Sequence, residues 1–283
     1  MNPVVFETGT TIIRYYTAWL SGGIFASIVI ITLLAYRRDP SLAARWMDVS
    51  IAALIGGIVG ARLLYVALEW DYFTLHHDEI SHIELGGMAW HGALLLGIPA
   101  ALLVARLRKV SLRPWSDALA LVWPLGMLAA WNGCRRAGCG YGGEVRTLAD
   151  WPGWVVSELP DVYGLIAPRF EVQRLGMVLS AVVFVLILLL TWRNWLAGVR
   201  FWMMLALSGI GLYIIGFYRV DPAHTILDRR ADQLFDLATV FFSSLIGGMI
   251  WIVDHQHTEE SQHENQPGAG PDDAETGGRE TES

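Results

Sequence analysis

YYTAWLSGGIFASIVIITLLA, residues 15–35, contains no charged side chain. A helix needs about 20 predominantly apolar residues to cross the hydrocarbon core of a bilayer, so this stretch alone predicts a transmembrane helix. Hydrophobic residues make up 54% of the 283 residues, and 13 residues are Trp. This composition excludes an ordinary water-soluble domain and a collagenous or low-complexity chain.

Six further stretches have a similar length and apolar character. They cover residues 49–68, 86–105, 115–133, 175–192, 201–218 and 234–253. In lipid each span must satisfy its own backbone hydrogen bonds, and a continuous helix does this most simply. We therefore predict an all-α integral membrane protein with seven transmembrane helices in one domain, residues 1–253. The fourth helix, which contains Pro124, is expected to be the least regular.

Basic residues in the short loops predict an orientation. The second loop has none, whereas the first, third and fifth loops hold Arg37, Arg38, Arg45, Arg106, Arg108, Lys109, Arg113, Arg193 and Arg200. Because short cytoplasmic loops are enriched in Lys and Arg, we expect the N-terminus outside and the C-terminus in the cytoplasm. Residues 1–11 carry no basic residue, so we expect no cleaved signal peptide.

The net charge of −7 belongs to the end of the chain. Residues 254–283 contain nine acidic residues and one basic residue, Arg279, so residues 1–253 are close to neutral. A polar, acidic segment of this kind cannot bury an apolar surface, and we predict a disordered cytoplasmic tail. The absence of a basic face argues against a nucleic-acid partner.

Polar residues converge on the predicted outer half of the membrane. Arg62 and His91 lie inside spans, where ionisable residues are functional candidates by default. The others near this zone are Tyr16, Arg135, Arg136, Glu144, Gln173, Arg219, Gln233 and Asp236. Structural alternatives remain open: Arg62 could snorkel or join two helices, and His91 could be an interhelical hydrogen-bonding residue. Asp236 could pair with an arginine.

The glycine-rich segment 133–144, GCRRAGCGYGGE, predicts irregular backbone. Its N–H groups could form an anion nest, and Arg135 with Arg136 could clamp a phosphate. The alternative is a loop that only turns the chain. Cys134 and Cys139 would lie on the oxidising side, where a disulfide or a redox pair is possible. The His77 and His82 spacing does not favour a helical metal site, so no metal or cofactor is expected.

Two motifs carry a family resemblance. The segments 60–66, GARLLYV, and 86–92, GGMAWHG, resemble the bacterial prolipoprotein diacylglyceryl transferase family, and the similarity extends over residues 15–253. The resemblance implies a multi-pass enzyme at the outer face of the bacterial inner membrane. Its lipid substrate would be phosphatidylglycerol, and its acceptor the lipobox cysteine that follows a prolipoprotein signal peptide. It implies His91 as the essential histidine, Arg62 and Tyr65 as site-lining residues, and Tyr16 as an aromatic near the lipid.

The chain departs from the family signature in the fourth span. Aligned without gaps from Pro124, the signature Arg and Asn fall on Trp131 and Cys134. We therefore hypothesise that Arg135 or Arg136 takes the place of the phosphate-binding arginine, with His91 as the third catalytic residue. The alternative is a catalytically degenerate relative that binds lipid or lipoprotein, or a membrane thiol-redox protein that uses the two cysteines.

Overall fold

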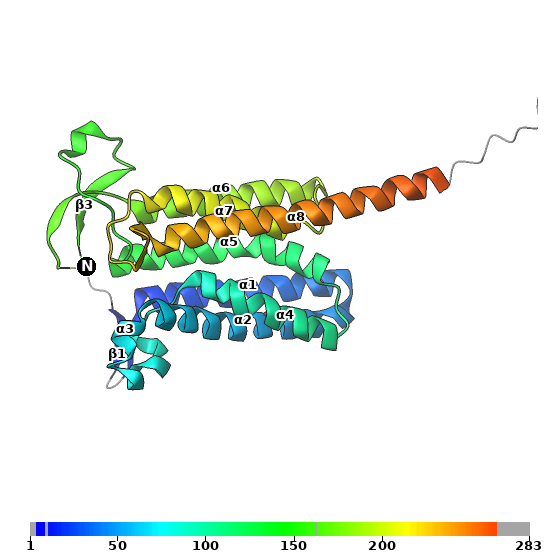
Figure 1. The fold of residues 1–283 in the computed structure, drawn as a ribbon, viewed down its shortest axis with the longest axis horizontal. Helices are drawn as coiled ribbons and strands as arrows, with labels where there is room; N and C mark the ends of the chain where they lie inside the picture. Colours follow the sequence, from blue (N-terminus) through cyan, green and yellow to red (C-terminus); the bar gives the residue numbers. More distant parts are fainter. Residues whose placement is uncertain (1–3, 9–10, 162, 265–283) are drawn as a thin grey trace, which may run out of the picture.

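A computed structural model describes residues 4–8, 11–161 and 163–264, and most of them are helical. The seven long helices of this part are α1 (Tyr15–Arg38), α2 (Pro40–Leu68), α4 (Trp90–Leu107), α5 (Leu112–Ala137), α6 (Val172–Trp192), α7 (Arg200–Gly216) and α8 (Ala231–Glu264). They run along the long axis of the molecule (Figure 1). Short helical turns, α3 (Trp70–Phe73), η1 (His77–Ser81), η2 (Ile83–Leu85) and η3 (Leu148–Asp150), lie in the connections.

Each predicted span overlaps one long helix, although α4 begins at Trp90, four residues after the predicted start of its span. Within the described residues, α1, α2, α4, α6 and the Ala231–Gln256 part of α8 are long and apolar enough to cross a membrane. The helix α7 is apolar but has 17 residues, and α5 contains Asp117 and two arginines in its last turn. The protein is therefore a largely helical, multi-pass membrane protein, while the count of seven crossings stays a prediction.

Two helix boundaries differ from the prediction for identifiable reasons. The helix α2 begins at Pro40, before the apolar stretch, because the Asp39 carboxylate accepts the Ser41 N–H at 2.8 Å and proline suits the first helical turn. The helix α5 continues to Ala137 and ends at Gly138, whose φ is +77°. The prediction of irregular backbone from residue 133 was therefore wrong up to residue 137.

The helix α8 also passes its predicted end. It continues beyond residue 253 to Glu264, and Asp254 accepts a hydrogen bond from Arg113 Nη1 at 2.7 Å. The first part of the predicted disordered tail is thus helical. Residues 265–283 lie outside the described residues, so the remainder of that prediction is untested.

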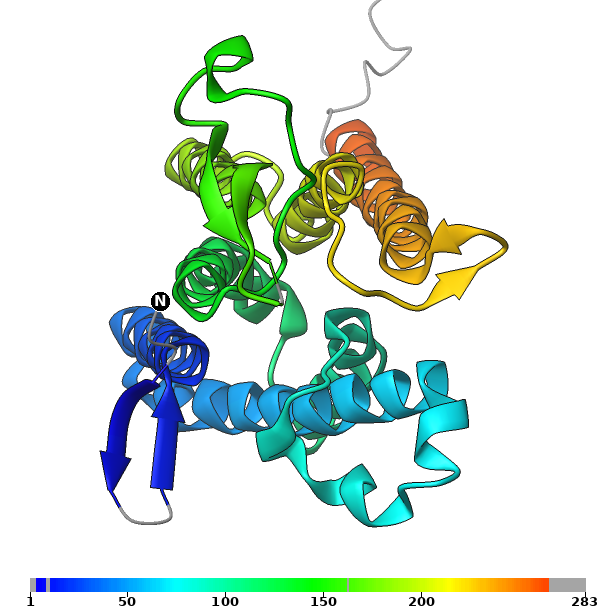
Figure 2. The ribbon, with the colours of Figure 1, turned by 90° about the vertical axis from the view of Figure 1, so that its left-hand side faces the viewer.

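Three antiparallel hairpins were not expected in an all-α protein. They pair β1 (Val4–Thr8) with β2 (Thr11–Arg14), β3 (Val156–Pro160) with β4 (Ile166–Phe170), and β5 (Thr225–Ile226) with β6 (Arg229–Arg230). All three lie at the end of the bundle where α1 and α8 begin (Figures 1 and 2). We call this end the hairpin end.

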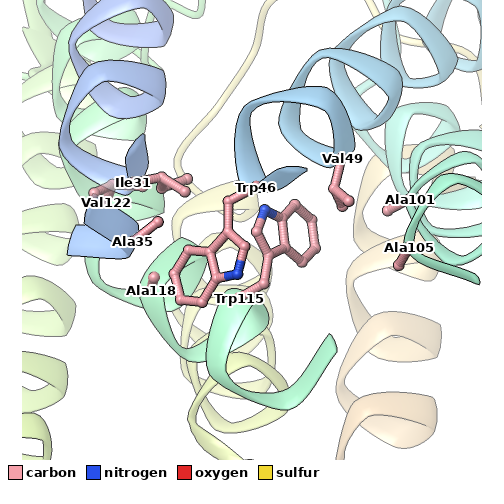
Figure 3. Packing of buried hydrophobic residues seen from close by; sticks show 9 residues of the cluster. All are labelled: Ile31, Ala35, Trp46, Val49, Ala101, Ala105, Trp115, Ala118 and Val122. Carbon is pink, nitrogen blue, oxygen red and sulfur yellow. The ribbon is translucent and has the colours of Figure 1, made fainter. Parts of the chain in front are cut away.

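The opposite end is closed by an apolar core (Figure 3). Trp46 and Trp115 are 2% and 5% exposed and pack among small side chains of α1, α4 and α5. The indole Nε1 of Trp115 donates to Ser50 Oγ at 3.1 Å, which satisfies the buried donor. This packing fixes α1, α2, α4 and α5 together away from the hairpin end.

A close glycine crossing joins α2 to α4 nearer the hairpin end. A Cβ atom added to Gly60 would lie 2.2 Å from the Gly92 carbonyl oxygen, and one added to Gly92 would meet the Gly60 oxygen at the same distance. Small residues allow membrane helices to approach in this way. The crossing places Arg62 and His91, close neighbours of these glycines in sequence, at the same level of the bundle.

Candidate active site

His91 and Asp236 form a buried pair between α4 and α8. The His91 Nε2 atom lies 2.8 Å from Asp236 Oδ1, and the two side chains are 6% and 5% exposed. Trp90 and Phe235 pack beside the imidazole, with ring centroids 4.0 and 5.4 Å away. Within the described part of the chain, no hydrogen bond engages His91 Nδ1. The partner of Asp236 is thus a histidine, in place of the arginine that the sequence suggested.

Four side chains beside this pair form an arginine–aspartate network, which comprises Arg219, Asp221, Arg230 and Asp232. The Arg219 guanidinium nitrogens lie 2.7 Å from an Asp221 carboxylate oxygen and 3.2 Å from one of Asp232. Arg230 Nη2 lies 3.5 Å from an Asp221 oxygen and 3.0 Å from an Asp232 oxygen. Asp232 precedes Asp236 by four residues on α8, so both lie on one helix face. The network therefore lies one helical turn from the buried histidine pair.

The electrostatics of the network keep Arg219 charged. Burial alone would lower the pKa of Arg219, but the hydrogen bond to Asp221 and the negative charges of Asp221 and Asp232 outweigh it. The pKa of Arg219 is consequently raised above its ordinary value. A permanently charged guanidinium can meet an anion without a protonation step.

The glycine-rich segment positions Arg219 through its backbone. Gly142 pairs with Arg219 in an antiparallel bridge, and the Gly143 N–H donates to the Tyr218 carbonyl at 2.9 Å. A Cβ atom at Gly142 would lie 2.3 Å from the Phe170 carbonyl oxygen, so only glycine fits there. The Gly143 N–H is thus not available to the predicted anion nest, and the segment acts as a backbone support.

A disulfide closes the start of this segment. Cys134 and Cys139 are bonded, as the sequence allowed. The Cys139 carbonyl accepts a hydrogen bond from Gln173 Nε2 at 2.7 Å, and Gln173 is 3% exposed. The Gln173 Oε1 atom is buried and accepts no hydrogen bond from any described residue. An unpaired buried acceptor is costly, and an incoming hydroxyl group would satisfy it.

The neighbouring residues Arg135 and Arg136 have different surroundings. Arg135 Nε lies 3.2 Å from Glu171 Oε2, and Glu171 is 1% exposed and also binds Arg174 at 2.8 Å. Arg136 is exposed and lies over the Tyr15 ring at 5.8 Å. Among the described residues no carboxylate forms a salt bridge with Arg136. Arg135 is therefore occupied by a structural ion pair, whereas Arg136 is open to an anion.

Arg62 is committed to the loop between α3 and α4. It donates five hydrogen bonds of 2.6 to 3.3 Å to the carbonyls of Glu79, Ile80, His82, Gly86 and Gly87. A guanidinium has five N–H groups, so each has a partner. Its Cζ atom also lies 5.8 Å from the Tyr65 ring and 5.3 Å from the Phe73 ring. Arg62 is placed to hold this loop, and its contact with a substrate stays a prediction.

Replacing Arg62 with alanine is expected to loosen the loop at residues 79–87. Hydrogen bonds to a charged group are worth roughly 1.5–3 kcal/mol each, so the free energy of unfolding should fall by at least this amount. Limited proteolysis in detergent should cut this loop faster than in the original protein. The matched control is Arg108→Ala, because Arg108 pairs with Asp48 on a partly exposed surface at the other end. Equal cleavage of both variants would contradict the role of Arg62.

The other predicted site residues lie at the hairpin end but do not form one cluster. Tyr16 is 38% exposed in the first turn of α1. Glu144 is largely exposed and accepts a hydrogen bond from the buried Arg169 at 2.7 Å. Gln233 is 8% exposed and donates to the Tyr213 carbonyl at 3.2 Å. Of these, Gln233 lies nearest in sequence to Asp236, on the same helix.

The sequence did not identify two acidic residues that organise the site, Asp232 and Glu171, and it identified Asp236 without its pairing with His91. The spacing of Asp232 and Asp236 by four residues was a readable sign that both share one helix face. Glu171 has such a sign only toward Arg174, three residues later, and none toward Arg135 on α5.

The geometry favours one class of chemistry. The imidazole offers an unengaged nitrogen as a proton acceptor, and cations lie nearby to hold an anion. Among the described residues no three His, Cys, Asp or Glu side chains are grouped to hold a metal ion. The arrangement suits a transfer reaction on an anionic substrate.

Comparison with known proteins identifies the same chemistry. The family model described as prolipoprotein diacylglyceryl transferase matches residues 3–253. The chain is 30% identical to the phosphatidylglycerol–prolipoprotein diacylglyceryl transferase of Symbiobacterium thermophilum over 83% of this chain and 87% of that protein. The chain is 31% identical to the enzyme of the same name from Geobacter sulfurreducens, over 79% of this chain and 84% of that protein. The identity to the enzyme of the same name from Acaryochloris marina is 38%, over 42% of this chain and 43% of that protein. This alignment therefore spans less than half of the relative.

Proposed function

The chain belongs to the prolipoprotein diacylglyceryl transferase family, and on this basis we propose that it transfers a diacylglyceryl group from phosphatidylglycerol to a prolipoprotein thiol. The acceptor is the lipobox cysteine next to the signal peptide. The products are a thioether-linked lipoprotein and glycerol phosphate.

The observation that carries this proposal is the buried His91–Asp236 pair beside Arg219. A thiol attacks as the thiolate, so the reaction needs a proton acceptor. The phosphodiester leaves with an additional negative charge, so it needs a fixed cation. The pair supplies the first requirement. Arg219 supplies the second when the phosphate takes the place of Asp221 or Asp232 at its guanidinium, while Arg230 keeps these carboxylates paired.

The reaction balances with these groups. The proton of the acceptor thiol moves to His91 Nδ1, and the sulfur forms a bond with the glyceryl carbon of the lipid. The bond between this carbon and the phosphate oxygen breaks, and its electron pair leaves with glycerol phosphate. Arg219 stabilises the charge that develops on the phosphate. His91 then releases its proton to the phosphate or to water.

We also propose a second cation for the phosphate. Arg136 has no carboxylate partner among the described residues and lies in the last turn of α5, within the glycine-rich segment. Its exposed position suits the initial capture of an anionic headgroup. This refines the hypothesis that Arg135 or Arg136 replaces the signature arginine, because the ion pair with Glu171 occupies Arg135.

The two arginines provide a matched test. Arg136→Ala is expected to reduce the transfer rate roughly tenfold, equal to about 1.4 kcal/mol, without changing the thermal unfolding midpoint. Arg135→Ala is expected to lower that midpoint, because Glu171 is buried and loses one of its cations. The rates would be measured with purified protein in phosphatidylglycerol vesicles. A double variant that transfers at the original rate would exclude both residues as phosphate ligands.

The proposed setting is the bacterial inner membrane, crossed seven times with the hairpin end outside. The basic loops support this orientation, because they all lie at the end opposite to the hairpins. The active site then lies in the outer half of the bilayer, within reach of outer-leaflet lipid. A prolipoprotein signal peptide would enter from the same membrane.

The direct test is a reconstituted transfer assay. Purified full-length protein is mixed with phosphatidylglycerol vesicles and a lipobox peptide, and the peptide mass is followed. We expect a gain of one diacylglyceryl group, release of glycerol phosphate, and no transfer to a peptide in which serine replaces the lipobox cysteine. Binding of the peptide without any transfer would support the alternative of a non-catalytic relative.

A further inference from the structure

Asp236 is the group through which α8 reaches the reacting histidine. Building on the proposed function, we propose that Asp236 is a positioning residue that fixes the tautomer of His91. Its carboxylate would hold the proton of the neutral imidazole on Nε2 and leave Nδ1 as the basic nitrogen. The reactive atom of the enzyme would then be set by a residue 145 positions away in the chain.

The hydrogen bond fixes the tautomer when Asp236 is ionised. An ionised carboxylate only accepts hydrogen bonds, so the nitrogen that contacts it must carry the proton. That nitrogen is Nε2, at 2.8 Å from Asp236 Oδ1. A neutral imidazole has one N–H, which leaves a lone pair on Nδ1. Trp90 and Phe235 pack against the ring and restrict its rotation.

The charged groups outside the pair that act on Asp236 most strongly belong to Asp232 and Arg219. Asp232 lies one turn earlier on α8, and Arg219 follows α7 and is bound to Asp232 at 3.2 Å. These two opposite charges largely compensate each other. Among the described residues, the side chain of Asp236 forms its hydrogen bond with His91.

The same contact stabilises the charged state that the reaction creates. When the thiol proton reaches Nδ1, the imidazole becomes a cation with two N–H groups. The carboxylate then forms a charge-assisted hydrogen bond with Nε2 in a site of low polarity. No other proton moves in this step, and Asp236 itself stays ionised.

The kinetic test uses three variants of the full-length protein. Asp236→Asn keeps the side-chain size and one hydrogen bond to His91. It should lower kcat roughly 10- to 100-fold, the range found when a group that orients a metal-binding histidine is lost. Its KM for the lipobox peptide should stay nearly unchanged, and Asp236→Glu should recover part of kcat. The matched control is Asp117→Asn, because Asp117 is also buried at 8% exposure but binds Gly198 N–H at the opposite end. An Asp236→Asn variant with the original kcat would overturn the proposal.

A spectroscopic test of the tautomer does not require the protein to be active in transfer. Nitrogen-15 NMR of the histidine-labelled protein in lipid nanodiscs, with His91→Gln used to identify the signal, distinguishes protonated Nε2 from protonated Nδ1. We expect protonated Nε2 in the original protein and a changed tautomer population in Asp236→Asn. Protonated Nδ1 in the original protein would overturn the proposal even if transfer is observed. If Nε2 is protonated but no transfer occurs, the positioning role of Asp236 is supported and the proposed function is refuted.

Discussion

Replacing His91 with alanine is expected to reduce the rate of diacylglyceryl transfer by roughly 10²- to 10⁴-fold, the usual contribution of a positioned acid–base residue. The physical reason is that the thiol of the acceptor would keep its proton at neutral pH, because its ordinary pKa is about 8.5. The loss should appear in kcat, with binding of the lipobox peptide largely retained. The rate would be measured in the vesicle assay described above.

Two controls separate loss of the base from loss of structure. His91→Gln retains a side chain that can donate to Asp236, so α4 and α8 should stay joined while the rate remains as low as in His91→Ala. His77→Ala removes an exposed histidine of the loop after α3 and should transfer at the original rate. Transfer by His91→Gln at the original rate would show that His91 is an interhelical contact and not the base.

The second large effect is expected at Arg219. Arg219→Gln should lower kcat by roughly 10²- to 10³-fold, the usual cost of removing one group that stabilises charge in a transition state. Arg219→Lys should recover only part of this loss, because an ammonium group cannot form two parallel hydrogen bonds with a phosphate. Both effects would be measured as release of glycerol phosphate from labelled phosphatidylglycerol.

The neighbouring arginines make the Arg219 test specific. Arg229 is exposed on β6, so Arg229→Gln controls for a general loss of positive charge near the lipid. Arg230 binds the same carboxylates as Arg219, so the network keeps one cation when Arg219 is replaced. If Arg219→Gln and Arg229→Gln transfer equally fast, Arg219 has no role in holding the phosphate.

The membrane helices were largely predictable, because hydrocarbon allows few alternatives. All seven predicted spans fall on helices, and the ionisable residues His91 and Arg62 stood out as exceptions within them. The hairpins were not predictable in the same way, since they lie outside the apolar spans. In β3 and β4 the paired residues, such as Val156 and Phe170, are separated by a loop that carries no apolar repeat.

The partners of the site residues were harder to predict than the residues themselves. The five acceptors of Arg62 are backbone carbonyls, which every residue has, so no sequence pattern marks them. The pairing of His91 with Asp236 depends on how α4 meets α8, which loop composition does not determine. The sequence thus indicated which residues were costly to place in a membrane, and the tertiary structure decided what each one binds.

The length of α8 has a mechanical consequence at the end of the bundle opposite to the hairpins. Its 34 residues span roughly 50 Å, about 20 Å more than the hydrocarbon core of a bilayer. The excess projects beyond the other helices at the end opposite to the hairpins (Figure 1). A rigid spacer of this length exceeds the Debye length of about 8 Å at physiological salt. The last turns of α8, which contain Glu259, Glu260 and Glu264, therefore lie farther from an anionic lipid surface than this screening distance, so their repulsion from it is screened.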